Sequence, residues 1–566
     1  MKTRTFAFIT ICVITILFSA KIKAYDFEQD GIYYNIVSVS DKTCEVTYKD
    51  TGYNSYSGDI TIPSTVTYNT QNVTVVGIGN NAFKNCRNLT SISLPNSLKS
   101  IGVSAFYDCR LVKELKIPKS VTTISGAFYQ LCLHLEKIIF EEGSIFKWDN
   151  FTVVDTTTGT IVAGNKKSTI PTSGASIIGR DAFIDSELFK LLTIPANIND
   201  IDFRAFENCK YLTDLRIEDS DSVLGLSSCF ENTSIKNVYI GRNFRVSNDP
   251  NTFAKVEYII LGPKVNKIHN GNFKGCHVLK SIRIEGTITE VENYAFYQCW
   301  ALEDLDFTKI QPEYIGDMMF YQCYKLKEIR FAENTTIKSF GVENLAGAKM
   351  YISESLNISE YGLQGCKVNS LIIEDSDKEL SLKDVMFVNL YMGRPTNITM
   401  GTSFEYKDHS SYVKSIEFGD KITSISVSTD FPKCVNLKSL IFGKNFISMT
   451  ASTFKPCTKI TTIISKNPTP PLNANFDDNV YLNAVVKVPK GSLNAYKEDL
   501  HWSKFWNISE MEESSGINNI DNDKTAIVYI YNLQGTLIKK GVLSSEATNG
   551  LPKGLYIIGG KKTLVK

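Results

Sequence analysis

The sequence predicts a repeat solenoid that stacks its strands into one long parallel β-sheet, with a β-rich N-terminal cap and a small C-terminal β-domain. Three observations predict this fold. The chain has 566 residues, which is too long for one ordinary compact core. A pattern of the form Ala-Phe-x-x-Cys recurs along it. A strand-like run of the form Leu-x-x-Ile-x-Leu follows most copies, so the two patterns together define one unit.

The Ala-Phe-x-x-Cys pattern sets the period of the repeat. Four copies are complete and three are looser, and neighbouring cysteines lie 109 − 86 = 23, 299 − 276 = 23 and 323 − 299 = 24 residues apart. The copies are Ala82–Cys86, Ala105–Cys109, Ala205–Cys209, Ala295–Cys299, Phe273–Cys276, Phe320–Cys323 and Phe454–Cys457. A period of this length is typical of a solenoid built from one supersecondary unit per repeat.

Each unit has a direct physical interpretation. Alternate side chains of a strand share one face, so the Ile-x-Leu pair turns two large side chains inward. A proline often ends the strand because it cannot donate to the ladder, as at Pro95, Pro118 and Pro195. One unit cannot bury its apolar face alone, and stacking buries it. We assign residues 76–466 to this solenoid.

Two stretches inside the solenoid depart from the period. The spacing between predicted strands widens to 192 − 138 = 54 residues, and the excess predicts a hairpin inserted at about residues 147–167. The cysteine and phenylalanine landmarks become sparse at about residues 332–430, which indicates degenerate repeats.

The ends of the array need covering because they expose apolar strand edges. Residues 25–75 are predicted to form the N-terminal β cap, and residues 467–513 the C-terminal cap. Residues 514–524 are polar and are predicted to be a linker. Residues 525–566 abandon the period and are predicted to form the separate small β-domain.

The first residues are typical of an export signal. A basic start precedes an apolar run, Phe6–Ala20, of about 15 residues, which suits a signal peptide and is short for a membrane span. We therefore assign residues 1–24 to a signal peptide and expect an exported chain with no stable membrane span. Lys plus Arg total 61 against 60 for Asp plus Glu, a balance that argues against nucleic acid as a partner.

The regular units resemble the BspA-type leucine-rich repeat. The run Ile117-Pro118-Lys119-Ser120-Val121, and Ile101-Gly102 ahead of Ala105-Phe106, follow the order of residues in that repeat. The resemblance covers roughly residues 60–466. It implies leucine-rich repeats of about 23 residues, a place on the cell surface or outside the cell, and a role in adhesion or protein recognition.

The C-terminal segment resembles a second family. Val528–Gly535, Gly550–Ile558 and Lys562–Lys566 are similar to the C-terminal sorting domain read by the type IX secretion system of Bacteroidota. This resemblance implies that residues 525–566 are a secretion address and are not part of the binding body.

The sequence contains no recognisable catalytic or metal-binding pattern. The five histidines form no His-Glu-x-x-His, no Cys-x-x-Cys occurs, and neither a Gly-x-Ser-x-Gly elbow nor a phosphate loop is present. We therefore expect a protein that is not an enzyme and that needs no cofactor and no metal. Catalysis by carboxylates leaves no obligatory sequence signature, so a hydrolase is kept as a third hypothesis.

Thirteen cysteines are present, and nearly all of those after the signal peptide occupy the inward position of the repeat. We expect buried free thiols that act as small apolar side chains at the corner of each unit. A disulfide needs a Cα separation and a dihedral angle that stacked identical rotamers do not provide. Cys44 lies in the cap, where this explanation does not apply.

The residue between the two inward positions of a strand points outward, so the sheet presents one such residue per unit as a row. The row is Ser93, Lys116, Ile139, Thr193, Arg216, Tyr239, Ile260, Arg283, Asp306, Arg330, Ile372, Glu417 and Ile441. Apolar members beside arginines are typical of a protein contact. An ordinary exposed β-face, on which Ile and Tyr are good strand formers, is the competing interpretation.

From this row we select Lys116, Arg216, Tyr239, Ile260, Arg283 and Arg330 as the candidate ligand-binding sheet face. The expected partner is a protein, such as a host matrix protein or a bacterial surface protein. The alternative partner is a glycan, which needs exposed rings as stacking platforms; Tyr239, Tyr258 and Trp300 are the candidates.

Overall fold

The computed structural model describes residues 24–186, 190–247, 252–338, 345–359, 362–363, 366–383, 385–399, 412–425, 431, 434–512, 527–531, 537–543, 548, 551–558 and 561–565. The predicted signal peptide, except Ala24, and the predicted linker lie outside these residues. Contacts divide the chain into two compact units. The first is Met1–Ile372 with Ser381–Phe387 and Gly401–Tyr406, and the second is Ile373–Leu380, Val388–Met400 and Lys407–Lys566.

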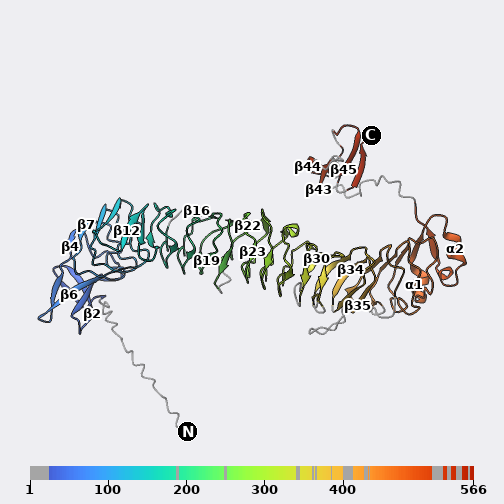
Figure 1. Cartoon of the computed structure of the whole chain (residues 1–566), viewed down its shortest axis with the longest axis horizontal. Coiled ribbons are helices and arrows are strands. Elements are labelled where there is room, and N and C mark those ends of the chain that lie inside the picture. The colour runs from blue at the N-terminus through green and yellow to red at the C-terminus, as the bar shows by residue number, and fades with distance from the viewer. Residues whose placement is uncertain are drawn as a thin grey trace, which may run out of the picture. The chain divides into compact units, whose positions relative to one another are not determined.

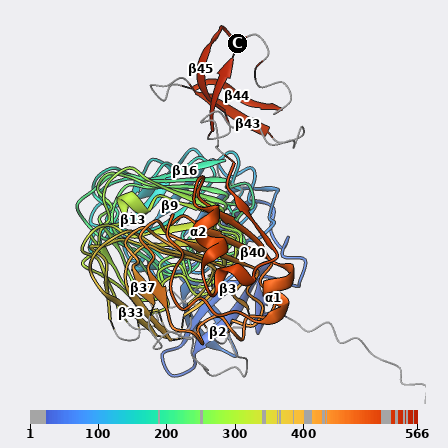
Figure 2. The same cartoon turned by 90° about the vertical axis from the view of Figure 1, so that its right-hand side faces the viewer.

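The first unit is a stack of coils, each of which contributes one main strand to a parallel sheet. This arrangement confirms the predicted solenoid with parallel strands (Figure 1). The main strands are β7 (Leu89–Ser93), β9 (Glu114–Ile117), β11 (Lys137–Phe140), β16 (Leu191–Ile194), β18 (Asp214–Ile217), β20 (Asn237–Ile240), β22 (Tyr258–Leu261), β24 (Ser281–Ile284), β26 (Asp304–Leu305), β28 (Glu328–Arg330), β30 (Leu345–Ile352) and β32 (Lys367–Ile373). The coils overlap along the line of sight in Figure 2.

Each coil also carries a second, shorter strand, which the sequence analysis did not predict. These strands stack in parallel on another side of the coil, for example Ile178 on Ile201. They are β8 (Ser100–Ile101), β10 (Thr123–Ile124), β15 (Ile177–Ile178), β17 (Asp200–Ile201), β19 (Leu224–Leu226), β21 (Phe244–Val246), β23 (Lys267–Ile268), β25 (Glu290–Val291), β27 (Tyr314–Ile315), β29 (Thr336–Ile337) and β31 (Asn357–Ile358). Both walls of the coil are therefore hydrogen-bonded ladders.

The N-terminal strands join both ladders. They are β1 (Phe27–Gln29), β2 (Ile32–Ser38), β3 (Thr43–Thr47), β4 (Gly58–Thr61), β5 (Thr65–Tyr68) and β6 (Gln71–Ile78). β4 pairs in parallel with β7, and β6 pairs in parallel with β8. The stacking thus begins within residues 25–75, and β1, β2 and β3 extend the second ladder as an antiparallel meander.

The insertion is a three-stranded meander. β12 (Phe146–Asp149), β13 (Thr152–Asp155) and β14 (Thr160–Gly164) pair antiparallel in that order. β14 then pairs in parallel with β15, which returns the chain to the second ladder. The insertion therefore has one strand more than the hairpin that the sequence analysis placed there.

The Ala-Phe-x-x-Cys turn needs a left-handed residue just before the cysteine. Asn85, Asp108, Asn208, Gln298 and Gln322 hold this position with φ between 58° and 61°. Asn and Asp tolerate this conformation better than most residues, and Gly275 occupies the same position in another coil with φ 75°. The left-handed backbone therefore explains why the residue before the cysteine is often polar, which side-chain packing alone does not explain.

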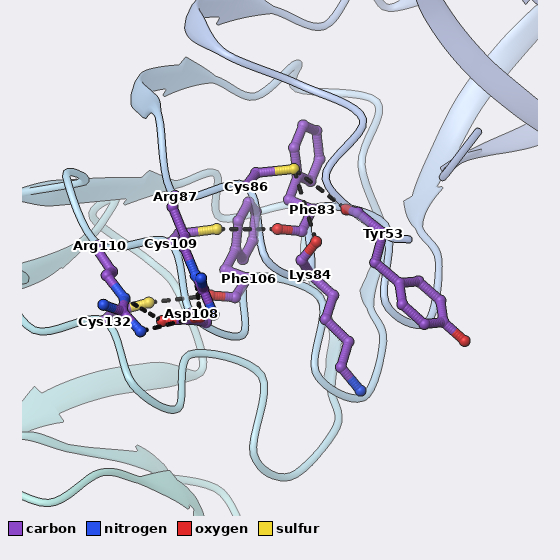
Figure 3. Close-up of polar contacts among 10 residues, drawn as sticks. All are labelled: Tyr53, Phe83, Lys84, Cys86, Arg87, Phe106, Asp108, Cys109, Arg110 and Cys132. Atoms are coloured by element: carbon purple, nitrogen blue, oxygen red, sulfur yellow. Dashed lines mark hydrogen bonds and ion pairs between the residues drawn. The ribbon is translucent and has the colours of Figure 1, made fainter. Parts of the chain in front are cut away.

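The core of the first unit is a column of parallel phenylalanine rings beside a column of thiols. Phe206 stacks on Phe183 at 5.0 Å between ring centroids and on Phe230 at 5.4 Å. The Cys209 thiol donates a hydrogen bond to the Phe183 carbonyl of the preceding coil, 3.3 Å away. Cys109 makes the same contact with the Phe83 carbonyl at 3.1 Å, and Figure 3 shows this corner of the stack.

The twelve cysteines of the described residues are all buried free thiols. Burial raises the pKa of Cys209 to about 12, and a hydrogen bond with Cys132 together with burial raises the pKa of Cys109 well above its ordinary value. The Cys209 and Cys109 thiols therefore stay protonated at neutral pH, and the thiolate is the reactive form.

The mature protein is therefore expected to melt at the same temperature with and without a reductant. Calorimetry in both conditions makes the comparison. Mass spectrometry that finds several linked Cys–Cys peptides from consecutive coils would show that the thiols are cross-linked instead.

The second unit carries its own stack of main and second strands and ends in two short helices and a tail sheet. β33 (Leu380–Lys383) and β34 (Met386–Met392) each have residues in both units. The remaining elements before the tail are β35 (Thr396–Thr399), β36 (Ser415–Phe418), β37 (Ser424–Ile425), β38 (Ser439–Phe442), β39 (Ser448–Met449), β40 (Thr462–Ser465), α1 (Asp478–Asn483), β41 (Val485–Val488), α2 (Leu493–Glu498), η4 (Trp502–Lys504) and β42 (Asn507–Glu510). β41 and β42 continue the parallel sheet beyond β40.

Aromatic side chains close the last coil of the second unit. Trp502 is fully buried, and its indole donates to the Pro471 carbonyl at 2.9 Å. Its ring packs edge-on against Tyr496 and Phe476. A Trp buried with its N–H bonded excludes water from the final apolar layer.

The C-terminal strands form a separate antiparallel sheet in the order β44, β43, β45, β46. They are β43 (Ile527–Tyr531), β44 (Leu537–Leu543), β45 (Gly554–Ile558) and β46 (Lys561–Val565). The parallel ladders of the coils do not include them.

Candidate functional site

The predicted outward row lies on β18, β20, β22 and β24 in direct register. Arg216 is opposite Tyr239, Tyr239 is opposite Ile260, and Ile260 is opposite Arg283. Both flanking residues in each strand are buried, as at Leu215 and Ile217 around Arg216. The alternation of a half-buried sheet therefore brings these four candidates together on one face.

Tyr239 is held in place from two sides. The guanidinium of Arg216 lies over its ring, 4.2 Å from the centroid. Its hydroxyl donates to Asp219 Oδ1 at 2.9 Å. Burial and this hydrogen bond raise the pKa of the Tyr239 hydroxyl, so it remains a donor at neutral pH. A fixed aromatic ring beside an arginine is the composition that dominates binding energy at protein interfaces.

Lys116 and Arg330, the other basic candidates of the row in the first unit, belong to other coils. Lys116 Nζ lies 3.6 Å from Glu114, and Arg330 Nε lies 3.7 Å from Glu328. In each case the carboxylate stands two residues away on the same strand. Such exposed pairs contribute little stability, so these residues are solvated members of the same face.

The row is interrupted at Asp306. Asp306 was predicted to continue it, but β26 ends at Leu305 and Asp306 caps the short helix η1 (Phe307–Lys309) by accepting from the Thr308 backbone amide at 3.0 Å. A depression of about 530 Å³ lies beside this break, lined by Arg283, Asp304, Asp306 and Lys327 among others. The sheet face is therefore charged beside this break.

Two aromatic row residues were missed by the sequence analysis. Tyr351 on β30 is opposite Arg330, whose guanidinium lies 3.8 Å from the centre of its ring. Tyr391 on β34 donates to Asp375 at 2.9 Å. Both lie in the stretch assigned to degenerate repeats, where cysteine and phenylalanine landmarks are sparse. The spacing of Met350 from Ile329, 350 − 329 = 21 residues, is the signal that could have located Tyr351.

The contacts around Tyr239 recur around Tyr391. In both places a tyrosine hydroxyl donates a hydrogen bond to an aspartate of the preceding coil. A glycine backbone amide donates to the carbonyl of the isoleucine two residues before that aspartate. A lysine forms an ion pair with a second aspartate. The first set is Ile217–Asp221, Tyr239, Gly241 and Lys264; the second is Ile373–Asp377, Tyr391, Gly393 and Lys421.

The row neighbours of the two tyrosines differ. Tyr239 is opposite Arg216 and Ile260, whereas Tyr391 is opposite Glu417 on β36. A Cβ on Gly262 would approach the Tyr239 hydroxyl to 2.5 Å, which shows how closely the ring is seated. The recurring contacts therefore hold a tyrosine of the row in place. The residues that surround the two tyrosines on the sheet face are different.

The three rings proposed as glycan platforms each have one face occupied. Arg216 covers Tyr239, Lys280 lies 5.5 Å from the ring centre of Tyr258, and His277 stacks on Trp300 at 3.8 Å. A sugar ring needs a free aromatic face for stacking. Stacking of a sugar on any of these rings would therefore have to use the opposite face.

A second polar cluster lies at the turn corner of the first coils, away from the row. The side chain of Asp108 is 3% exposed and accepts from Arg87 Nε and Arg110 Nε, each at 2.7 Å (Figure 3). Burial acts to raise the pKa of this carboxyl, but the hydrogen bonds from Arg110 and Arg87 outweigh it, so the pKa lies below its ordinary value.

The Asp108→Asn variant is expected to be less stable than the wild type by about 1–2 kcal/mol at pH 7, because a charged acceptor is lost while the left-handed backbone is kept. A depressed folded pKa contributes stability above the unfolded pKa of about 3.9 and loses it as pH falls through the folded pKa. The difference between the two proteins should therefore shrink below about pH 4. Urea unfolding at several pH values measures it, and a gap that stays constant down to acid pH would contradict the ionic role.

The described residues contain neither a candidate metal site nor a candidate membrane-spanning helix. Among the described residues, no group of three or more His, Cys, Asp or Glu side chains could hold a metal ion. In the same part of the chain, no helix has the length and apolarity that a bilayer crossing requires.

The geometry defines a leucine-rich-repeat solenoid, a class whose extended sheets are typically binding scaffolds rather than enzymes. The family model "BspA type Leucine rich repeat region" matches residues 53–173, 162–254, 246–369 and 398–522. These ranges cover most of the chain, so the protein belongs to this family.

Solved leucine-rich-repeat structures are similar to the chain at low identity. A protein from Bacteroides ovatus is 21% identical over 86% of this chain and 100% of its own, with a TM-score of 0.25. One from Eubacterium ventriosum is 17% identical over 55% and 97%, with a TM-score of 0.30. A leucine rich cell surface protein from Faecalibacterium prausnitzii is 16% identical over 86% and 95%, with a TM-score of 0.19. No curated protein matches the chain. Likeness at this level says nothing about ligands.

Proposed function

We propose that the protein is exported and acts at the cell surface or outside the cell in protein recognition or adhesion, with the row around Tyr239 as its contact surface. The observation that carries the proposal is the seating of Tyr239 between Arg216 and Asp219 on a rigid sheet, beside the outward Ile260. A pre-organised aromatic anchor loses little entropy on binding. Membership of the family supports the same role.

A binding screen of the mature protein against matrix proteins, mucins and bacterial surfaces tests the proposal. We expect a protein ligand whose affinity falls when Tyr239 is replaced. Binding confined to a glycan array and lost in Tyr239→Ala would support the glycan alternative. Turnover that survives purification and disappears with one carboxylate substitution would support the hydrolase hypothesis.

We also propose that residues 1–24 are a signal peptide and that residues 525–566 direct secretion. The tail has its own antiparallel sheet, and Trp502 closes the last coil before it. Deleting residues 525–566 is expected to leave the melting temperature of the body nearly unchanged. In the native host the truncated protein should accumulate in the periplasm. Unfolding of the truncated body would show that the tail is a structural cap, and normal export would show that it is not an address.

A further inference from the structure

We infer that Arg216 binds a carboxylate of the ligand. The bound segment is an extended peptide that places an aspartate or glutamate over Arg216 and an apolar side chain, two residues further on, over Tyr239 and Ile260. This inference rests on the proposed function, since it names the partner chemistry of the same face.

Arg216 differs from the other basic residues of the candidate face. Lys116 and Arg330 pair with a carboxylate two residues before them, and Arg283 pairs with one two residues after it, Glu285, at 3.1 Å. No carboxylate within the described ranges pairs with Arg216. Its guanidinium is exposed and rests on the Tyr239 ring instead.

The two carboxylates that could pair with Arg216 by the same spacing are engaged elsewhere. Asp214 accepts from Thr213 Oγ1 at 2.6 Å and from Asn237 Nδ2 at 2.8 Å. Glu218 accepts from the Ala196 backbone amide at 3.1 Å. Asp219, the next acid, accepts from the Tyr239 hydroxyl. The N–H groups of Arg216 are therefore available to a carboxylate of the ligand. A planar guanidinium binds a carboxylate in bidentate fashion.

The width of the apolar surface favours an extended chain over a helix. On one side of the row, Glu257 pairs with Lys236 and Lys280; on the other side lie the acids that follow β18. A helix of about 10 Å diameter would cover these charged groups and remove water from them, at a cost in free energy. An extended chain turns only alternate side chains toward the face, which suits an apolar strip one residue wide.

The spacing of the row fits the repeat of an extended chain. Neighbouring row positions lie about 4.8 Å apart, so Tyr239 and Ile260 stand about 4.8 and 9.6 Å from Arg216. Residues i and i+2 of an extended peptide lie about 6.7 Å apart. An acid over Arg216 therefore places the i+2 side chain between Tyr239 and Ile260.

The test selects peptides from a displayed library of random sequences of about 12 residues on the full mature chain. We expect enriched peptides with an Asp or Glu followed two positions later by an apolar residue. Their affinity should fall about tenfold or more in Arg216→Ala, which removes a charge-assisted contact. Arg216→Lys should fall between the two, because an ammonium cannot bind in bidentate fashion. Arg245→Ala is the matched control and should change affinity less than about twofold, since Arg245 is exposed on β21 in the second ladder, outside the row.

The outcomes separate this inference from the proposed function. Peptides that bind wild type and Arg216→Ala equally but lose affinity in Tyr239→Ala would overturn the carboxylate and leave the face in place. Peptides insensitive to Tyr239→Ala would overturn both. A library that yields no enriched sequence, or one that yields acid and apolar residues four positions apart, would overturn the extended segment. Unchanged melting temperatures, which we expect for the variants at the exposed Arg216 and Arg245, exclude unfolding as the cause. For Tyr239→Ala, whose side chain is half-buried, affinity is compared only at a temperature at which circular dichroism shows the variant to be folded.

Discussion

Replacing Phe206 by alanine is expected to destabilise the first unit by about 3–5 kcal/mol, the usual cost of emptying a buried aromatic site. Phe206 is 1% exposed and lies between two parallel rings, so its removal breaks the column on both sides. Each coil of a solenoid contacts mainly its neighbours, so the loss should also loosen the adjoining coils. Urea unfolding followed by circular dichroism measures the shift of the midpoint.

Phe203→Ala in the same turn is the matched control. Phe203 is 37% exposed, and its only described ring contact is the Arg180 guanidinium at 5.0 Å. We expect this variant to lose less than about 1 kcal/mol. Equal losses in Phe203→Ala and Phe206→Ala would mean that the ring column does not hold the coils together.

Replacing Arg242 by alanine is expected to cost about 3 kcal/mol, because it empties a buried site and removes three hydrogen bonds between coils. The Arg242 side chain is fully buried and donates to the carbonyls of Pro195 and Ala196, each at 3.0 Å, and to Ser222 Oγ at 3.1 Å. The two carbonyls belong to a coil two positions earlier, so the guanidinium ties three coils together.

Arg245→Ala, three residues further on, is the control for Arg242→Ala. Arg245 is exposed on β21, and its replacement should change stability by less than about 0.5 kcal/mol. Arg242→Lys should recover only part of the loss, because one ammonium does not reproduce the fork of donors. If Arg242→Ala unfolds at the same urea concentration as wild type, the buried arginine has no structural role.

The regular part of the fold was predictable because buried positions recur at a fixed period. Phe206 repeats Phe183 one coil earlier and Phe230 one coil later, so its burial follows from the pattern. The second ladder was not predictable in this way, since a strand such as Ile177–Ile178 is only two residues long and has no alternation to detect. Arg242 was also missed, because a charged residue after a strand is normally exposed.

The candidate face was predictable only in part. Alternation in four-residue strands located Arg216, Tyr239, Ile260 and Arg283, although the coils between them vary in length (239 − 216 = 23, 260 − 239 = 21 and 283 − 260 = 23 residues). The phase alone could not show that β26 ends before Asp306, because a helix cap competes for that aspartate. Contacts such as the hydrogen bond from Tyr239 to Asp219 join different coils, and one sequence gives no sign of them.

We propose that the protein recognises a protein ligand through the sheet face around Tyr239. The most direct test takes a ligand found in the binding screen and measures its dissociation constant for wild type, Tyr239→Ala and Tyr211→Ala. Tyr211 is 65% exposed in a turn outside the main sheet, so it controls for the loss of an exposed tyrosine.

We predict that Tyr239→Ala weakens binding of the ligand by about 30-fold or more, because Tyr239 is a central aromatic anchor. Tyr211→Ala should leave the affinity unchanged. Equal affinity of wild type and Tyr239→Ala for the ligand would contradict the proposal.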